Sequence, residues 1–68
     1  MIYMDDHPPA HVHVLRAGEE VIINLGDAET RVSTRENKRM SKHNERRAII
    51  IAGEHQDYLL ARWREIHG

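Results

Sequence analysis

The hydrophobic pattern of this chain changes once, near residue 40, and this change constrains the fold more than any other feature. Before it, residues 10–14 (AHVHV) alternate apolar and polar side chains, and residues 20–25 (EVIINL) are rich in β-branched residues. Both patterns are typical of short strands with one buried face. After it, apolar residues recur at spacings of three and four, as on one face of a helix. The sequence therefore predicts an α+β fold, a small antiparallel sheet of about three strands followed by one helix.

Turn-forming residues divide the first half of the chain. Pro8 and Pro9 interrupt it early, because proline has no N–H to donate to a strand ladder. Gly18 can adopt the positive φ that a tight hairpin needs. Strands are expected within residues 2–4, 10–17 and 20–25, with residues 30–34 (TRVST) as an additional edge strand.

The second half predicts one long C-terminal helix over about residues 42–66. Ser41 is a suitable N-cap, since its hydroxyl can accept a hydrogen bond from a backbone N–H of the first turn. Gly53 costs about 1 kcal/mol relative to alanine inside a helix, so a bend there is the alternative to a straight helix. The whole chain, residues 1–68, is expected to form a single small domain with one face of the sheet under the helix. Its core is expected to contain Val12, Val14, Val21, Ile23, Leu25, Ile49, Ala52, Leu59 and Trp63.

A domain of 68 residues needs support beyond its own core, because it buries only about 60% of its unfolded surface. The chain has no cysteine, which excludes disulfides and thiolate zinc sites. Imidazole–carboxylate metal binding or self-association could supply the support. The second sheet face would present His11, His13 and Leu15 beside Ile22, without a covering helix, so a homodimer is expected.

The chain has no apolar run near the roughly 20 residues that a membrane span needs. Its start, MIYMDDHPP, also lacks the basic segment and apolar stretch of a signal peptide. We therefore expect a cytoplasmic protein without membrane contact.

Residues 6–14 (DHPPAHVHV) hold three histidines, an acid and two prolines, and three interpretations stay open. His11 and His13 lie two apart on a strand and should point to the same side. With His7 and Asp6 they could bind a divalent transition metal such as zinc. Without metal, His11 and His13 could act as a catalytic acid–base pair. The third interpretation is structural, with imidazoles that bond to turn backbone or lie in a dimer interface.

Positive charge is concentrated between Arg31 and Arg47, a segment that contains seven basic residues and only two glutamates. Such a segment could contact the phosphates of a nucleic acid or an acidic protein partner. No aromatic residues are interleaved for base stacking, so a solvated surface is the alternative. The candidate contact residues are Arg35, Lys38, Arg39 and Arg46.

The histidine segment and the closing helix resemble the prokaryotic domain-of-unknown-function family 4160. The family signature Asp-His-x-Pro-Pro-His-x-His-Val has Ala10 in place of its second proline here. Its other fixed positions match Asp6, His7, Pro9, His11, His13 and Val14, and the helix pattern Glu-His-x-x-x-Leu-x-x-x-Trp matches Glu54, His55, Leu59 and Trp63. The resemblance implies no established activity. It implies a partner encoded in the same small operon, as in a toxin–antitoxin pair.

Two functions follow as hypotheses. The first is a small cytoplasmic interaction module, acting as a homodimer or with an operon-encoded partner, through the histidine face or the basic segment. The alternative is a small hydrolase or nuclease that uses His7, His11 and His13, with or without a divalent metal. In that case Asp6 would orient an imidazole, and Arg35, Lys38 and Arg39 would hold phosphate.

Overall fold

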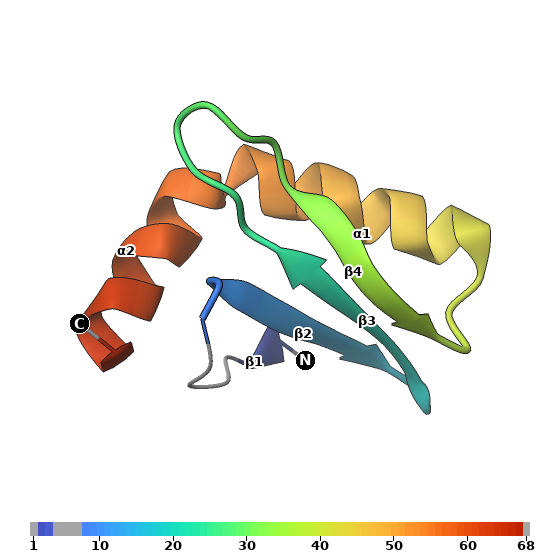
Figure 1. The fold of residues 1–68 in the computed structure, drawn as a ribbon. Coiled ribbons are helices and arrows are strands. Elements are labelled where there is room, and N and C mark those ends of the chain that lie inside the picture. Colours follow the sequence, from blue (N-terminus) through green and yellow to red (C-terminus); the bar gives the residue numbers. More distant parts are fainter. Residues whose placement is uncertain (1, 4–7, 68) are drawn as a thin grey trace.

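The computed structural model describes residues 2–3 and 8–67 of the chain (Figure 1). Four strands form one sheet in the order β1-β2-β3-β4, in which each strand is antiparallel to its neighbours. Two helices follow the sheet in the sequence, and the predicted α+β class is confirmed. The elements are β1 (Ile2–Tyr3), β2 (His11–Arg16), β3 (Glu19–Asn24), β4 (Ser33–Lys38), α1 (Lys42–Glu54) and α2 (Gln56–His67).

The β2–β3 hairpin forms the centre of the sheet. Val12 pairs with Ile23, and the strands meet at a two-residue turn of Ala17 and Gly18. Both turn residues have positive φ, at 48° and 85°. Turns of this kind match the right-handed twist of the strands they join.

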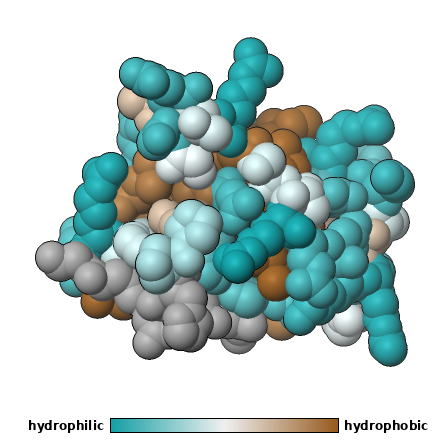
Figure 2. Space-filling view, in the orientation of Figure 1, coloured by the Kyte–Doolittle hydropathy of each residue, from teal (hydrophilic) through white to brown (hydrophobic). Residues whose placement is uncertain are grey.

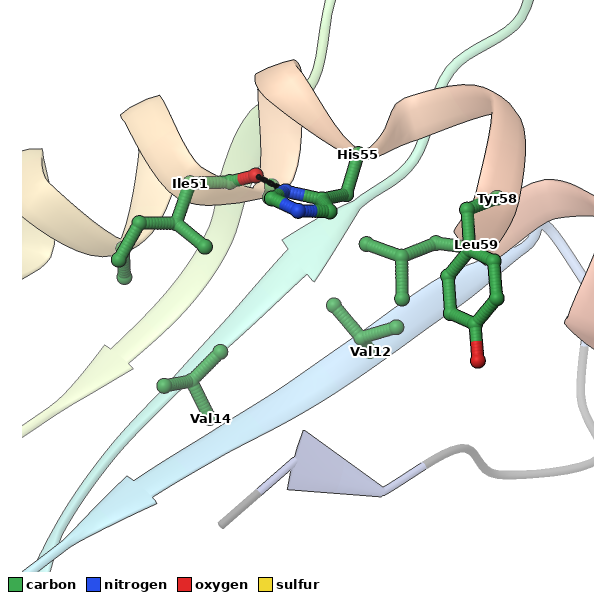
Figure 3. Close-up of a pocket in the computed structure, with 8 residues that line it drawn as sticks. Val12, Val14, Ile51, His55, Tyr58 and Leu59 are labelled. Atoms are coloured by element: carbon green, nitrogen blue, oxygen red, sulfur yellow. Dashed lines mark hydrogen bonds between the residues drawn. The ribbon is translucent and has the colours of Figure 1, made fainter.

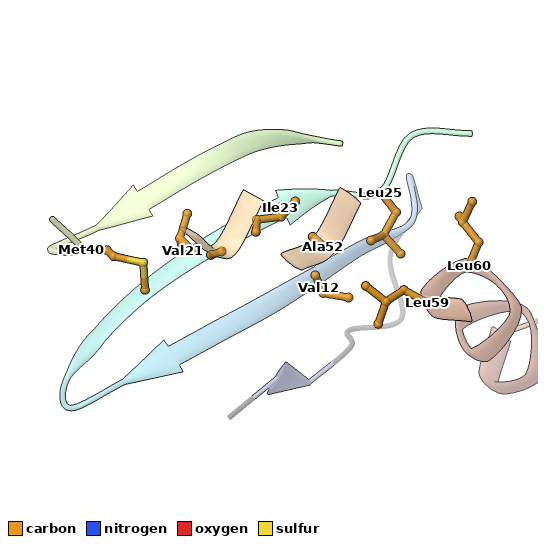
Figure 4. Close-up of a cluster of buried hydrophobic side chains, with 9 residues drawn as sticks. Val12, Val21, Ile23, Leu25, Met40, Ala52, Leu59 and Leu60 are labelled. Atoms are coloured by element: carbon orange, nitrogen blue, oxygen red, sulfur yellow. The ribbon is translucent and has the colours of Figure 1, made fainter. Parts of the chain in front are cut away.

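The core lies between the sheet and the helices (Figure 4). α1 packs mainly on β3 and β4. Six of the nine expected core residues are buried, and Val14, Ile49 and Trp63 are partly buried against them. Met40, Ala48 and Leu60 are also buried, although they were not among the expected core residues. The buried cluster consists of Val12, Val21, Ile23, Leu25, Met40, Ala48, Ala52, Leu59 and Leu60.

The prediction of one long helix over residues 42–66 is wrong. The predicted N-cap is present, because Ser41 Oγ accepts from the backbone N–H of Asn44 at 3.1 Å. However, α1 ends at Glu54, and His55 has φ −113° and ψ 18°, outside the helical region. The predicted bend site, Gly53, remains inside α1. The chain therefore changes direction at His55, two residues after the predicted bend at Gly53.

Gln56 explains why the second helix begins where it does. Its side-chain Nε2 lies 2.6 Å from the carbonyl oxygen of Leu25 and 3.0 Å from those of Asp27 and Thr30. An amide with two N–H donors thus holds the first residue of α2 against the β3–β4 connection.

The last strand also differs from its predicted position. β4 spans Ser33–Lys38, whereas a strand was expected over residues 30–34. Thr30 belongs to a tight turn instead, in which Asp27 Oδ1 accepts from the backbone N–H groups of Glu29 and Thr30, both at 2.8 Å. Asp27 and Thr30 also exchange backbone hydrogen bonds. These local bonds compete with strand pairing, as aspartate side chains commonly do.

β4 is exposed along its whole length and its pairing with β3 is irregular. Ile22 pairs with Glu36 and Ile23 with Thr34, so Arg35 is an extra residue in the ladder. This is the arrangement of a β-bulge. As a result, Thr34 and Asn37 both reach α1, although they are three residues apart.

Candidate functional site

The side chains of β2 alternate between the two faces of the sheet. Val12 and Val14 face the helices, and His11 and His13 lie on the other side of the sheet, as the alternation predicts. The two imidazole centroids are 5.3 Å apart and the rings are tilted by 56°. Both residues are buried, with only 3% of His11 and 8% of His13 exposed.

Each imidazole is held through its Nδ1 atom. His11 Nδ1 lies 2.8 Å from the carbonyl oxygen of Pro9, and His13 Nδ1 lies 2.6 Å from Glu20 Oε2. A carbonyl and a carboxylate only accept hydrogen bonds, so Nδ1 is the donor in both rings. In the neutral form, Nε2 is then the unprotonated nitrogen of each ring. The two histidines are thus set in the same tautomer.

Glu20 was not identified as a site residue from the sequence. It lies on β3 two residues before Ile22, which is the register partner of His13. Residues two apart on a strand share a face, so Glu20 is a diagonal cross-strand neighbour of His13. The hairpin register, once known, would have indicated this pair.

The structure describes two of the four residues proposed for a metal site, His11 and His13. Imidazoles whose Nδ1 donates to a carbonyl or a carboxylate are common among metal ligands and general bases, because that bond fixes the ring. Two of the four proposed ligands, Asp6 and His7, lie outside the described residues. Within residues 2–3 and 8–67, no group of three or more His, Asp or Glu side chains is arranged to hold a metal ion. The described residues therefore provide two oriented imidazoles, whose hydrogen bonds also satisfy buried polar groups.

The four basic contact candidates are exposed. Arg35 and Lys38 belong to β4, Arg39 follows it with a positive φ of 70°, and Arg46 lies on α1. None of the four forms an ion pair with another residue in the described part of the chain. The face shown in Figure 2 is mostly hydrophilic, and hydrophobic residues are visible on it only in separate patches.

A carboxylate connects β4 to α1 beside these basic residues. Glu45 Oε2 accepts from Thr34 Oγ1 at 2.6 Å, and Glu45 Oε1 accepts from Asn37 Nδ2 at 2.9 Å. The hydrogen bond from Thr34, followed by that from Asn37, lowers the pKa of Glu45 below its ordinary value, because both favour the ionised form. A negative charge is thus fixed where β4 meets the helix.

An apolar hollow that the sequence did not indicate lies between β2 and the two helices (Figure 3). It has a volume of about 270 Å³. Ile51 and Tyr58 on its rim are 48% and 63% exposed. We call it the β2 groove; its lining residues are Val12, Val14, Ala48, Ile51, Ala52, His55, Tyr58 and Leu59.

The β2 groove results from three features of the fold. α1 packs mainly on β3 and β4, so it only partly covers β2. Ala48 and Ala52, one helical turn apart, put small side chains where larger ones would fill the space. The break at His55 then turns α2 toward the end of the sheet.

The groove also corrects the expectation about which surface is open. The histidine face of the sheet was expected to be exposed and to support a homodimer. His11, His13 and Ile22 on that face are each less than 10% exposed. Among the side chains that the structure describes, the large exposed apolar ones lie on the helices, at Ile50, Ile51, Tyr58 and Ile66.

Together, the fold and the site define a small α+β protein with two buried, oriented histidines and an apolar groove on the opposite face. Residues 1–64 match the family model DUF4160, described as a domain of unknown function, and the chain belongs to this family. No curated protein and no solved structure matches the chain. Neither helix in the described residues is long and apolar enough to cross a membrane.

Proposed function

We propose that this protein is a small interaction module that binds another polypeptide in the β2 groove. The observation that carries the proposal is the groove itself, an apolar hollow with two large, partly exposed side chains on its rim. Tyrosine is enriched among residues that dominate binding energy, and apolar hollows receive such anchors from partners. Transfer of Ile51 and Tyr58 out of water would supply the driving force.

The partner that we propose is a protein encoded beside this one, as in a toxin–antitoxin-like pair, with both proteins in the cytoplasm. This part rests on the family resemblance, which the match over residues 1–64 supports at the level of the family. The exposed basic residues Arg35, Lys38, Arg39 and Arg46 offer a second contact surface, for an acidic region of the partner or for nucleic acid. Such charges steer association more than they determine affinity.

Site-specific photo-crosslinking tests the use of the groove. A benzophenone amino acid in place of Ile51 reports on the rim of the groove, and the same group in place of the exposed Glu29 reports on the β3–β4 connection, away from the groove and from the basic contact residues. We expect Ile51 to give a discrete cross-linked protein in cells, identified by mass spectrometry, that Glu29 does not give. The identified protein, once purified, should bind the wild type and lose at least about tenfold in affinity for Ile51→Asp. Identical products from both positions, or equal affinity for Ile51→Asp, would contradict the proposal.

The second candidate function is a histidine-dependent hydrolase or nuclease, with or without a divalent metal such as zinc. The observation in its favour is that His11 and His13 have the same tautomer and adjacent rings. It ranks second because both residues are buried, and a substrate or an ion would have to reach them.

Titration with zinc, followed by imidazole ¹⁵N NMR, tests the histidine site. A metal site predicts stoichiometric shifts confined to His7, His11 and His13. A metal-free enzyme predicts that His11→Ala abolishes cleavage of RNA, DNA or a phosphodiester while the protein stays folded. Scattered weak shifts together with no cleavage, with or without divalent metals, would reject this function.

A further inference from the structure

We propose that the occupant of the β2 groove is an α-helix of a partner protein, apolar on one face and acidic at the end that lies beside Arg16 and Arg47. This inference rests on the proposed function, and it specifies the shape and the charge of what binds. Three features of the structure support it: the partial cover of β2 by α1, the length of the groove and the charge at one of its ends.

The partial cover of β2 leaves a place for a helix. Neighbouring strands are about 4.8 Å apart and a helix is about 10 Å wide, so one helix covers about two strands. α1 packs mainly on β3 and β4, and on β2 the side chain of Val14 is only partly buried beside it. α2 does not fill this space, because the break at His55 directs it to the end of the sheet (Figure 1).

An added strand fits this place less well than a helix. Strand addition needs an unpaired backbone edge, and β2 pairs with β3 along its length and with β1 at His13 and Val14. The groove opens on the face of β2, where the side chains of Val12 and Val14 point toward Ile51 and His55 (Figure 3). Side chains inserted from one face of a helix match such a surface.

The groove continues along β2 into a second hollow of about 280 Å³, and the two share Val14, Ala48 and Ile51. Together they extend from Val12 to Arg16 on the strand. At roughly 3.3 Å per residue this distance is about 13 Å, the length of about nine helical residues. A helix of two to three turns, with apolar anchors at i, i+4 and i+7, therefore fits the full length.

The two ends of the groove differ in charge. Arg16 and Arg47 line one end, and His55 and Tyr58 line the other. Arg16 is the cross-strand partner of Glu19, which places a carboxylate near it. Arg47 is exposed and has no ion pair within the described residues, so its charge is available to a partner. Guanidinium groups bind carboxylates in two-point contacts, which favours Asp or Glu at this end of the bound helix.

Synthetic cross-linked helices of about 14 residues test the proposal, since uncross-linked peptides of that length are marginally helical. The probe carries leucines at i, i+4 and i+7 and glutamates at one end. One control peptide has lysines in place of the glutamates, and another has serines in place of the leucines. Binding is followed by the methyl NMR signals of Val12, Val14 and Ile51.

We expect saturable shifts of these methyl groups with the glutamate peptide, about tenfold weaker binding of the lysine peptide, and no binding of the serine peptide. Arg47→Glu should reverse the preference between the glutamate and lysine peptides. Arg64→Glu is the matched control, because Arg64 on α2 is also exposed but lines neither hollow, and it should leave the preference unchanged.

The outcomes separate this inference from the proposed function. No saturable shifts with the leucine peptides would overturn the helix as occupant, and the crosslinking at Ile51 would still decide whether the groove binds a protein. Equal affinity for the glutamate and lysine peptides, unchanged in Arg47→Glu, would overturn the acidic end. Concentration-dependent shifts of the same methyl groups without peptide would identify a second copy of this chain as the occupant and overturn the partner helix.

Discussion

Val12 and His11 are neighbours on β2, and both are almost fully buried, but they are buried by different means. Val12 lies in an apolar cluster, where any well-shaped hydrocarbon neighbour contributes. His11 needs a specific acceptor, the carbonyl oxygen of Pro9, because a buried polar atom without a partner is costly. The comparison indicates why the two faces of this small sheet differ. The histidine face depends on particular hydrogen bonds, and the helix face depends on apolar burial that is incomplete over β2.

The largest effect on stability is expected from alanine substitutions of Ile22 and Ile23. These residues are adjacent on β3 and face opposite sides of the sheet. Ile23 is fully buried in the core cluster, and Ile22 lies outside that cluster on the histidine face. We expect Ile23→Ala to lower the free energy of unfolding by about 2–5 kcal/mol, and Ile22→Ala to lower it by about half as much, because Ile22 lies outside the core cluster. Urea unfolding of both variants measures the difference. An equal or larger loss for Ile22→Ala would show that the histidine face holds a second apolar core.

A smaller effect is expected on the histidine face from Glu20→Ala. This change removes the carboxylate that accepts from His13 Nδ1, and it should cost about 1–3 kcal/mol of stability. Glu20→Gln keeps an acceptor oxygen and is the matched control, with a smaller loss. Imidazole ¹⁵N NMR should show His13 protonated at Nδ1 in the wild type. If the neutral ring is protonated at Nε2, the assigned tautomer is wrong.

On the helix face, Gln56→Ala should loosen the start of α2 and with it the end of the β2 groove. The change removes the donors that hold three carbonyl groups of residues 25–30, and we expect a loss of about 1 kcal/mol. Gln56→Glu has nearly the same size but lacks the N–H donors, so it should lose a similar amount. Chemical denaturation measures the loss, and amide hydrogen exchange at Leu59 should become faster. Full stability of Gln56→Glu would show that packing, rather than hydrogen bonding, holds α2.

The smallest effect on stability is expected from loss of the hydrogen bond between Thr34 on β4 and Glu45 on α1. Thr34→Val removes the hydrogen bond that contributes most to the low pKa of Glu45, so this pKa should rise toward its ordinary value. A carboxyl group with a lowered folded-state pKa stabilises the protein above its unfolded-state pKa, and this contribution is lost as the pH falls through the folded value. The variant should therefore lose less stability than the wild type on acidification.

Carboxyl NMR titration checks this shift, and Asp27 is an internal control. The pKa of Asp27 is also lowered, chiefly by the backbone N–H of Glu29, and Thr34 takes no part in that interaction. It should titrate identically in both proteins. An unchanged pKa of Glu45 in Thr34→Val would mean that Asn37 alone stabilises the carboxylate.

The parts of the fold that depend on local pattern could be predicted, and those that depend on distant contacts could not. The alternation of His11 to Val14 indicated the strand and both of its faces, and Ser41 indicated the start of α1. The break at His55 depends on the contact of Gln56 with residues 25–30, which no helical pattern contains. The start of β4 depends on the side chain of Asp27, which closes a turn over residues expected to be a strand.

The sequence likewise predicted only part of the candidate site. The orientation of His11 and His13 follows from strand geometry, but the role of Glu20 requires the register of the hairpin. The β2 groove could not be foreseen, because it arises from where α1 lies over the sheet. Ala48 and Ala52 alone, read as small residues on a helix, do not indicate which strand they face.

The bulged, exposed strand β4 has a consequence for how this protein can associate. An open sheet edge is a template on which another chain can add a strand, and repeated addition leads to fibrils. Here that edge carries the sequence STRENK, with charged side chains and an extra residue at Arg35 that disturbs its regular spacing. Growth of the sheet in this direction is thereby discouraged. The apolar surface on the helix side can thus stay exposed without growth of the sheet through β4.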